Sequence, residues 1–143
     1  MSYRSRKENK TYSRYTKNVQ KAGVCEFCDI KEGDEGFVKE LTYFKVIYNK
    51  FPYTFFDYHK ITDHLLVIPK KHTDTISSFT ADEALEYTQL VGDYEAKGYD
   101  VFSRAPSSKQ KSVPHQHTHL IKPVGKEIKT MIYTKKPFIR VVH

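Results

Sequence analysis

Three histidines at alternate positions form the most reactive stretch of this 143-residue sequence. His115, His117 and His119 stand within residues 112–121, Ser-Val-Pro-His-Gln-His-Thr-His-Leu-Ile. Side chains alternate between the two faces of an extended strand, so this spacing predicts three imidazoles on one face, roughly 6.5–7 Å apart. Imidazole is a nucleophile, a proton carrier and a metal ligand near neutral pH. Three imidazoles are too polar for an ordinary core, so we expect them to form a functional site.

The two cysteines, Cys25 and Cys28, form a Cys-x-x-Cys pair. The chain begins with polar and basic residues and shows no export signal, which favours metal or redox chemistry over a structural disulfide. No thioredoxin-like strand precedes the pair. The spacing therefore favours a metal site.

The composition indicates a cytoplasmic protein of one domain without a membrane partner. No apolar run approaches the roughly 18 residues of a membrane span. The net charge is +7, from 24 Lys and Arg against 17 Asp and Glu. Such a balance suits polyanionic partners, either phosphorylated small molecules or nucleic acid, and it also suits simple solubility.

The first 22 residues are basic, with Glu8 as their single acid. Tyr3, Tyr12 and Tyr15 are interleaved with the cations, and such tyrosines can stack on bases. We expect residues 1–22 to be an arm that orders against the body or a partner, with nucleic acid as one candidate. Residues 23–143 are expected to form the single domain.

Hydrophobic patterns predict strands at residues 37–41, 43–48, 65–68, 99–103 and 112–121. Residues 65–68 are continuously apolar, which predicts burial on both faces of the sheet. Residues 55–62 are expected to form an aromatic loop. Pro123 and Gly125 are expected to end the histidine strand, and residues 129–133 and 138–142 to add edge strands.

One long helix is predicted at residues 81–96. Thr80 and Glu83 form a capping box at its start, and Gly98 ends it. The spacing of its apolar residues, three or four positions apart, predicts a buried stripe of Ala84, Tyr87, Val91 and Tyr94. The fold class is therefore α+β, an antiparallel sheet of about five strands with one long helix and a basic N-terminal arm.

The order of these features resembles the histidine triad superfamily over residues 25–122. The motifs that carry the resemblance are Asn49 at a strand end, His64-Leu-Leu-Val-Ile-Pro-Lys-Lys-His72, the capped helix, and the alternating histidines of residues 112–121. The resemblance implies a compact sheet with helices, a homodimer, and activity on nucleoside phosphates.

The resemblance also implies roles for the histidines. His117 would attack the α-phosphorus and form a covalent nucleotidyl-histidine, which water or another acceptor would discharge. Neutral imidazole attacks through one nitrogen only if its proton is on the other, so a backbone carbonyl, that of His115, is expected to hold the tautomer. His119 would stabilise the phosphate oxygens or the leaving group, Ser112 would donate a hydrogen bond, and His64 would lie close by.

Three further residues are candidates for substrate binding. Asn49 matches the family position whose side chain holds the ribose hydroxyls, although Asn at a strand end is also a common turn former. Arg104 and Lys111 depart from the family, since many members have Asn and Gln there. Cations bind phosphate oxygens by charge. This departure favours a dinucleoside polyphosphate or an adenylylated nucleic-acid end over a phosphoramidate.

Several members of the superfamily bind zinc with a set that matches Cys25, Cys28, His72 and His115. Two thiolates and two imidazoles satisfy tetrahedral zinc and leave no open position, as in a structural site. A rival interpretation makes the three alternating histidines a catalytic metal site, but it leaves the cysteines without a purpose. We therefore expect structural zinc.

An alternative function is a zinc-stabilised basic module that binds nucleotides or nucleic acid without turnover. It would explain the positive charge and the basic residues 1–22. It predicts binding that weakens steeply with salt and survives the loss of His117.

Overall fold

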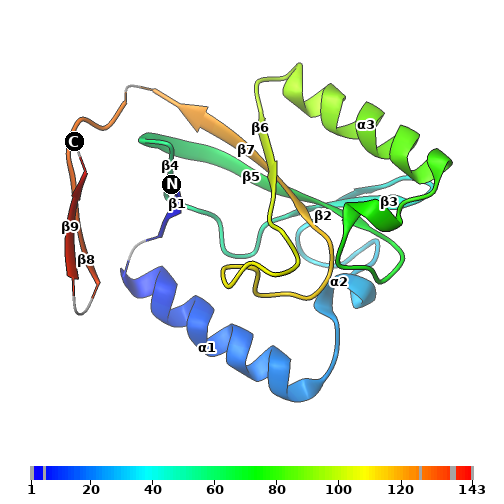
Figure 1. Cartoon of the computed structure of the whole chain (residues 1–143), viewed down its shortest axis with the longest axis horizontal. Coiled ribbons are helices and arrows are strands. Elements are labelled where there is room, and N and C mark those ends of the chain that lie inside the picture. The colour runs from blue at the N-terminus through cyan, green and yellow to red at the C-terminus, as the bar shows by residue number, and fades with distance from the viewer. Residues whose placement is uncertain (1, 5, 126, 136–137, 143) are drawn as a thin grey trace.

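The computed structural model describes residues 2–4, 6–125, 127–135 and 138–142, and it has an α+β fold (Figure 1). Seven antiparallel strands form one sheet in which β5 pairs with β3, β4 and β7. Strands β1, β2 and β6 extend it by pairing with β4, β3 and β7. The bounds are β1 Ser2–Tyr3, β2 Phe37–Glu40, β3 Phe44–Tyr48, β4 Phe55–Phe56, β5 His59–Pro69, β6 Asp100–Ser103 and β7 Thr118–Val124.

Strand β5 is buried on both faces between residues 65 and 68, as its continuous apolar sequence predicts. Leu65 and Val67 pack in one core cluster with Leu90 of helix α3 (Ala81–Glu95). Leu66 and Ile68 face the opposite side and pack in a second cluster. That second cluster includes Phe27 of the short helix α2 (Glu26–Asp29). The sheet is therefore covered on both sides, and the second side is the one that carries the cysteines.

Helix α3 begins with the capping box that the sequence predicts. The Glu83 N–H lies 3.3 Å from Thr80 Oγ1, and the Thr80 N–H lies 2.7 Å from Glu83 Oε2. The helix ends near Gly98, which adopts a positive φ of 83° that an L residue rarely takes. The buried stripe differs at two positions, because Leu90 is 2% exposed whereas Ala84 is exposed.

Helix α1 (Arg6–Ala22) occupies the region where the sequence predicted only an arm. It lies on the side of the sheet opposite α3 (Figure 1). Tyr12 and Tyr15, three positions apart, share one helix face, and their rings lie 5.3 and 5.0 Å from the ring of Phe51. The structure thus has two long helices rather than one. The basic residues Lys7, Lys10, Arg14 and Lys17 stay exposed.

Three other predictions of strands and loops are wrong. Residues 55–62 form β4 and the start of β5, joined through Asp57 and Tyr58 in the left-handed region. Strand β7 begins only at Thr118, after two of the three histidines, and it runs through Pro123 beside a bulge in its pairing with β5. Strands β8 (Met131–Lys135) and β9 (Phe138–Val142) pair with each other in a separate sheet and not at the edge of the main one.

A short 3-10 helix, η1 (Ile76–Ser78), joins β5 to α3. Among the described residues, no helix is long and apolar enough to cross a membrane.

Candidate functional site

The three alternating histidines are buried side by side, although two of them precede strand β7. His115, His117 and His119 are 0%, 6% and 5% exposed. The residues between them hold the extended segment from its other face. Thr118 Oγ1 lies 2.8 Å from the Tyr87 hydroxyl, and Gln116 Nε2 lies 3.2 Å from Ser103 Oγ. Side-chain anchoring at Gln116 and Thr118 therefore adds to the strand pairing that begins at Thr118, and together they keep the histidines on one side.

His117 is held in a single tautomer. Its Nδ1 lies 2.8 Å from the carbonyl oxygen of His115, so the Nδ1–H donates to that oxygen and Nε2 keeps its lone pair. Burial lowers the pKa of His117 to about 4, although the same hydrogen bond opposes this shift. The ring of Phe27 packs 5.3 Å away and contributes to this burial. His117 is therefore a neutral imidazole at pH 7 with one nitrogen available for attack.

His64 and His119 form a hydrogen-bonded pair beside His117. The backbone N–H of Tyr53 donates to His64 Nδ1 at 3.1 Å, so the proton of His64 is on Nε2. That Nε2 lies 2.9 Å from His119 Nδ1, which must accept. His119 therefore carries its proton on Nε2, a buried atom without a hydrogen-bond partner in the described part of the chain. The rings of His119 and His117 are 5.1 Å apart, so a free N–H donor lies next to the nucleophile.

Both members of this pair are neutral. Burial, followed by the charge of Arg4, lowers the pKa of His64 to about 3. Burial also lowers the pKa of His119 well below its usual value, and the nearby His64 adds to this effect. A proton on either ring would be a poorly solvated charge.

Asn49 lies at the end of β3 beside His64. Its Oδ1 accepts the N–H of Phe51 at 2.9 Å, as in a turn former. Its Nδ2 lies 3.0 Å from His64 Nε2, but both nitrogens carry protons in the tautomer set by Tyr53, so this is a contact and not a hydrogen bond. The carboxamide therefore shapes the turn after β3 and lies next to the histidine pair. The structure brings together Asn49, His64 and His119, as predicted from three separate segments.

Ser112 and Arg104 lie close to the histidines, and each has a protein partner. The Tyr12 hydroxyl of α1 donates to Ser112 Oγ. Arg104 donates to the Tyr53 hydroxyl at 3.2 Å, and its charge lowers the pKa of His117. Lys111 donates to the carbonyl oxygen of Asp74 at 2.6 Å, and its charge, like that of Arg104, contributes to the low pKa of His117.

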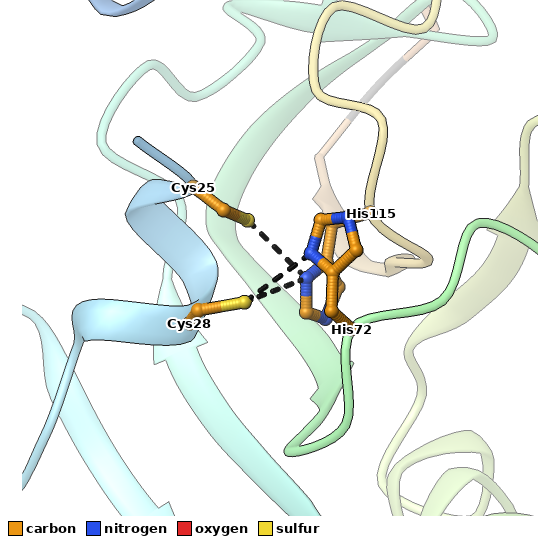
Figure 2. Close-up of side chains that lie close together, drawn as sticks. All are labelled: Cys25, Cys28, His72 and His115. Atoms are coloured by element: carbon orange, nitrogen blue, oxygen red, sulfur yellow. Dashed lines mark hydrogen bonds between the residues drawn. The ribbon is translucent and has the colours of Figure 1, made fainter. Parts of the chain in front are cut away.

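The four predicted metal ligands converge from α2, the segment after β5 and the segment before β7 (Figure 2). Cys25 Sγ lies 3.3 Å from His115 Nδ1, and Cys28 Sγ lies 3.3 Å from His72 Nδ1. Tetrahedral zinc with bonds of about 2.0–2.3 Å would separate its ligand atoms by roughly 3.3–3.8 Å. All four ligand atoms lie within 4.8 Å of one another, so this donor set fits a four-coordinate zinc.

His115 is oriented toward the cysteines by its other nitrogen. The Nε2–H donates to the carbonyl oxygen of Pro69 at 2.9 Å, which leaves the Nδ1 lone pair facing the thiols. A backbone carbonyl on the second nitrogen is the usual arrangement for a metal-binding histidine.

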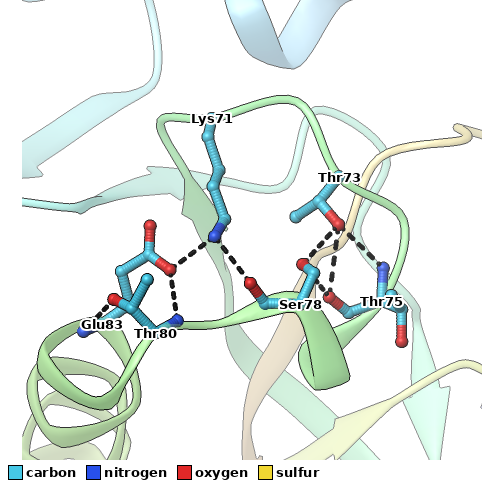
Figure 3. Close-up of polar contacts among 6 residues, drawn as sticks. All are labelled: Lys71, Thr73, Thr75, Ser78, Thr80 and Glu83. Atoms are coloured by element: carbon cyan, nitrogen blue, oxygen red, sulfur yellow. Dashed lines mark hydrogen bonds and ion pairs between the residues drawn. The ribbon is translucent and has the colours of Figure 1, made fainter.

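The residues on either side of His72 are held by polar contacts. Lys71 binds the carboxylate of Glu83 at the start of α3 (Figure 3). The Thr73 carbonyl accepts the N–H of Gln116 at 2.5 Å, which ties this segment to the one that carries His115. The backbone around His72 is therefore fixed by contacts that do not involve a metal.

Sequence reasoning missed Tyr53, Arg4 and Tyr12 as parts of the site. Tyr53 stands in an aromatic stretch of the sequence, where nothing distinguishes it from its neighbours. Its burial results from strand pairing, which the local sequence pattern does not predict. Arg4 and Tyr12 belong to the basic segment that was expected to be an arm. The alternation of tyrosines with cations there was the available signal.

Two of three comparisons with known proteins find similar chains. No family model matches the chain. A protein of Bacillus subtilis (strain 168) called Protein hit is 30% identical over 111 residues, which are 71% of this chain and 72% of that one. A HIT family hydrolase from Legionella pneumophila Philadelphia 1 has a similar structure, with a TM-score of 0.52 and 25% identity over 73% of this chain and 95% of that one. A histidine triad protein from Clostridium difficile also has a similar structure, with a TM-score of 0.52 and 26% identity over 71% of this chain and 91% of that one.

Proposed function

Because this chain belongs to the histidine triad family, we propose that it is a hydrolase or transferase that cleaves a nucleoside phosphate at the α-phosphorus through His117. The observation that carries the proposal is the hydrogen bond from His117 Nδ1 to the carbonyl oxygen of His115. It leaves a neutral nitrogen lone pair in a buried site, which is what nucleophilic attack on phosphorus requires.

The first step forms a bond between His117 Nε2 and the α-phosphorus and breaks the bond from phosphorus to the leaving group. The leaving group departs with the bonding electron pair and takes up a proton. The positive charge on the imidazole is shared with the His115 carbonyl through the Nδ1–H. In the second step, water adds to phosphorus and gives up a proton to the solvent. The P–N bond breaks with its electron pair returning to His117 Nε2, and the nucleoside monophosphate leaves with neutral His117 restored. An alcohol or phosphate acceptor in place of water makes the reaction a transfer.

His119 supplies the hydrogen bond that develops during this reaction. Its Nε2–H is buried, neutral and without a partner in the described structure, so a phosphate oxygen or the leaving-group atom can accept from it. A donor that is fixed before the reaction stabilises developing negative charge without reorganisation. Ser112 takes the same kind of role, because its oxygen accepts from Tyr12 and its own hydroxyl proton can still be donated.

A cavity of about 310 Å³ lies next to Ser112, on the side of the metal cluster. It is lined by Thr16, Ser112 and Val113 and by the proposed metal ligands Cys25 and His72. This volume is at the lower end of the range for ligand pockets.

Zinc has a structural role in this proposal. Cys25, Cys28, His72 and His115 would hold it, and all four positions would be filled by protein. It would tie α2 and the segment after β5 to the backbone whose carbonyl orients His117.

The proposal is tested by comparing wild type with His117→Ala on diadenosine tetraphosphate and on an adenosine phosphoramidate. Wild type is expected to cleave at least one of them and to give an acid-labile nucleotidyl adduct on rapid quenching. His117→Ala is expected to lose at least about 1,000-fold in rate and all adduct, because the nucleophile is absent. His59→Ala is the matched control, since it removes a histidine whose ring contacts only the backbone of Asp57.

Hydrolysis by His117→Ala at the wild-type rate would refute the covalent mechanism. Binding without turnover by wild type would instead favour the nucleotide- or nucleic-acid-binding module.

A further inference from the structure

Tyr53 joins the histidine pair to two arginines. It is 7% exposed, and its ring lies 4.7 Å from that of His64 and stacks on that of His119 at 5.7 Å. Its other ring face and its hydroxyl are each occupied by a guanidinium. Both guanidiniums are partly exposed, so their charges are held beside this buried ring and are accessible to a ligand.

Arg4 reaches this tyrosine from the segment before α1. Its guanidinium carbon lies 4.5 Å from the ring centre of Tyr53 and 4.3 Å from that of Tyr12. Its Nε–H donates to the carbonyl oxygen of Phe51 at 3.0 Å. Two ring faces and one hydrogen bond therefore fix the plane of the guanidinium, which has little rotational freedom left to lose when it binds a ligand.

Arg104 approaches the same tyrosine from the loop before the histidine segment. It donates to the Tyr53 hydroxyl and lies over the ring of Phe102 at 5.4 Å. Phe102 in turn stacks on His119, with the ring centres 4.4 Å apart and the planes at 7°. The charges of both arginines contribute to the low pKa of His119, which is consistent with their closeness to that ring.

Neither guanidinium pairs with a carboxylate in the described part of the chain, where the ion pairs join Lys70 to Glu40 and Lys71 to Glu83. The donor on His119 Nε2 is also without a partner among the described residues. The site therefore presents two positive charges and one neutral donor near His119, and the described residues place no carboxylate on either cation.

We propose that Arg4, Arg104 and the Nε2–H of His119 form an anion subsite for the phosphates of the leaving group. It rests on the proposed function and narrows the substrate class to nucleotides whose leaving group is itself a phosphate, as in a dinucleoside polyphosphate or an adenylylated 5′-phosphate end. Guanidinium binds phosphate oxygens with two parallel hydrogen bonds, which an amine leaving group cannot accept. The N-terminal segment thus supplies a substrate-binding residue, Arg4.

The test compares Arg4→Gln with wild type on two substrates that share the adenosine 5′-phosphoryl group. Diadenosine tetraphosphate has a polyphosphate leaving group, and adenosine 5′-phosphoramidate has a neutral one. We expect Arg4→Gln to lower kcat/KM for the tetraphosphate by about 10- to 100-fold and to change it for the phosphoramidate by less than about 3-fold. Arg14→Gln, which removes an exposed cation from the adjoining helix α1, is expected to leave both kcat/KM values unchanged.

Affinity is measured in parallel by calorimetry in the His117→Ala background, so that the result does not depend on turnover. Addition of Arg4→Gln is expected to weaken binding of diadenosine tetraphosphate by about 10-fold or more, and Arg4→Lys to restore part of it by charge alone. Unchanged affinity, or an equal loss on both substrates, would overturn the anion subsite. Full activity of His117→Ala would instead overturn the covalent mechanism, so the two failures are distinguishable.

Discussion

The Nε2 atom of His64 lies 2.9 Å from the Nδ1 atom of His119. Because the N–H of Tyr53 occupies the other nitrogen of His64, the proton between the two rings belongs to His64. This contact forces His119 to carry its own proton on the far nitrogen. A backbone amide in the turn after β3 therefore determines, through two imidazoles, which atom near His117 can donate.

Replacement of His64 tests this chain of hydrogen bonds. His64→Ala leaves His119 Nδ1 without a donor, so its proton is expected to distribute over both nitrogens. We expect kcat/KM to fall by about 10- to 100-fold, as for a lost hydrogen bond of roughly 1–3 kcal/mol. Nitrogen-15 NMR of the His119 ring should show one tautomer in wild type and a mixture in the variant. His64→Gln, whose amide can donate in place of the imidazole, should recover part of the rate. An unaltered His119 spectrum in His64→Ala would contradict the assignment of the His119 proton to Nε2.

The same buried histidine makes stability dependent on pH. The pKa of His64 is about 3 in the folded chain, against an ordinary value near 6.5, because the ring is buried and Arg4 and His117 lie nearby. Only the unfolded chain binds the proton between these values. The free energy of unfolding is therefore fully retained above pH 6.5 and falls as the pH is lowered toward 3, by up to about 1.4 kcal/mol per pH unit from this group.

Urea denaturation at pH 7.0, 5.5 and 4.5 measures this dependence. His64→Gln cannot bind the proton. Its free energy of unfolding should therefore fall less steeply with decreasing pH than that of wild type, by up to about 1.4 kcal/mol per pH unit. Parallel profiles for the two proteins would mean that His64 titrates alike in the folded and unfolded chains.

Zinc binding is tested by metal analysis. Wild type expressed in zinc-containing medium is expected to contain one equivalent per chain, and Cys28→Ser to lose most of it. The variant should also unfold at a temperature lower by about 5 °C or more, because binding free energy is gained only in the folded state. His59→Ala should keep its metal. Less than half an equivalent in wild type would rule out the four-ligand site.

The capping box of α3 contributes to stability in a way that can be isolated. Thr80→Ala removes the acceptor for the Glu83 N–H and is expected to cost about 1 kcal/mol in the free energy of unfolding. Thr88→Ala makes the same chemical change inside the helix, at an exposed position, and should cost nothing or stabilise slightly. Chemical denaturation of both variants measures the difference. Equal effects would show that the N-terminal cap adds no stability.

The sequence predicted several elements of the fold because their signals are local. The capping box depends on two residues three positions apart, and the burial of residues 65–68 on a continuous apolar run. The metal ligands and the His115 carbonyl followed from a motif order that resembles a known family, and the structure brings the four ligands together. The roles of the site residues in catalysis are still predictions.

What the sequence did not reveal depends on contacts between distant segments. Residues 6–22 have a mean polarity typical of an arm, and their helix is held by Tyr12 and Tyr15 against Phe51, which lies far along the chain. Lys111 was expected near phosphate, yet the backbone path of its loop turns the ammonium to Asp74. Strand β5 begins six residues earlier than its apolar run, because pairing with β4 and β7 overrides its local polar pattern.

The pairing of Ser2–Tyr3 with β4 has a practical consequence for anyone who prepares this protein. An affinity tag fused at the N-terminus would continue from a strand that lies three residues or fewer from Arg4, and its charges would enter the neighbourhood of the histidine pair. A tag at the other end would extend from the β8–β9 sheet, which pairs only with itself. C-terminal fusions are therefore the better choice for kinetic work. Residues that remain after cleavage of an N-terminal tag would lie close to Arg4, which is proposed to bind the substrate.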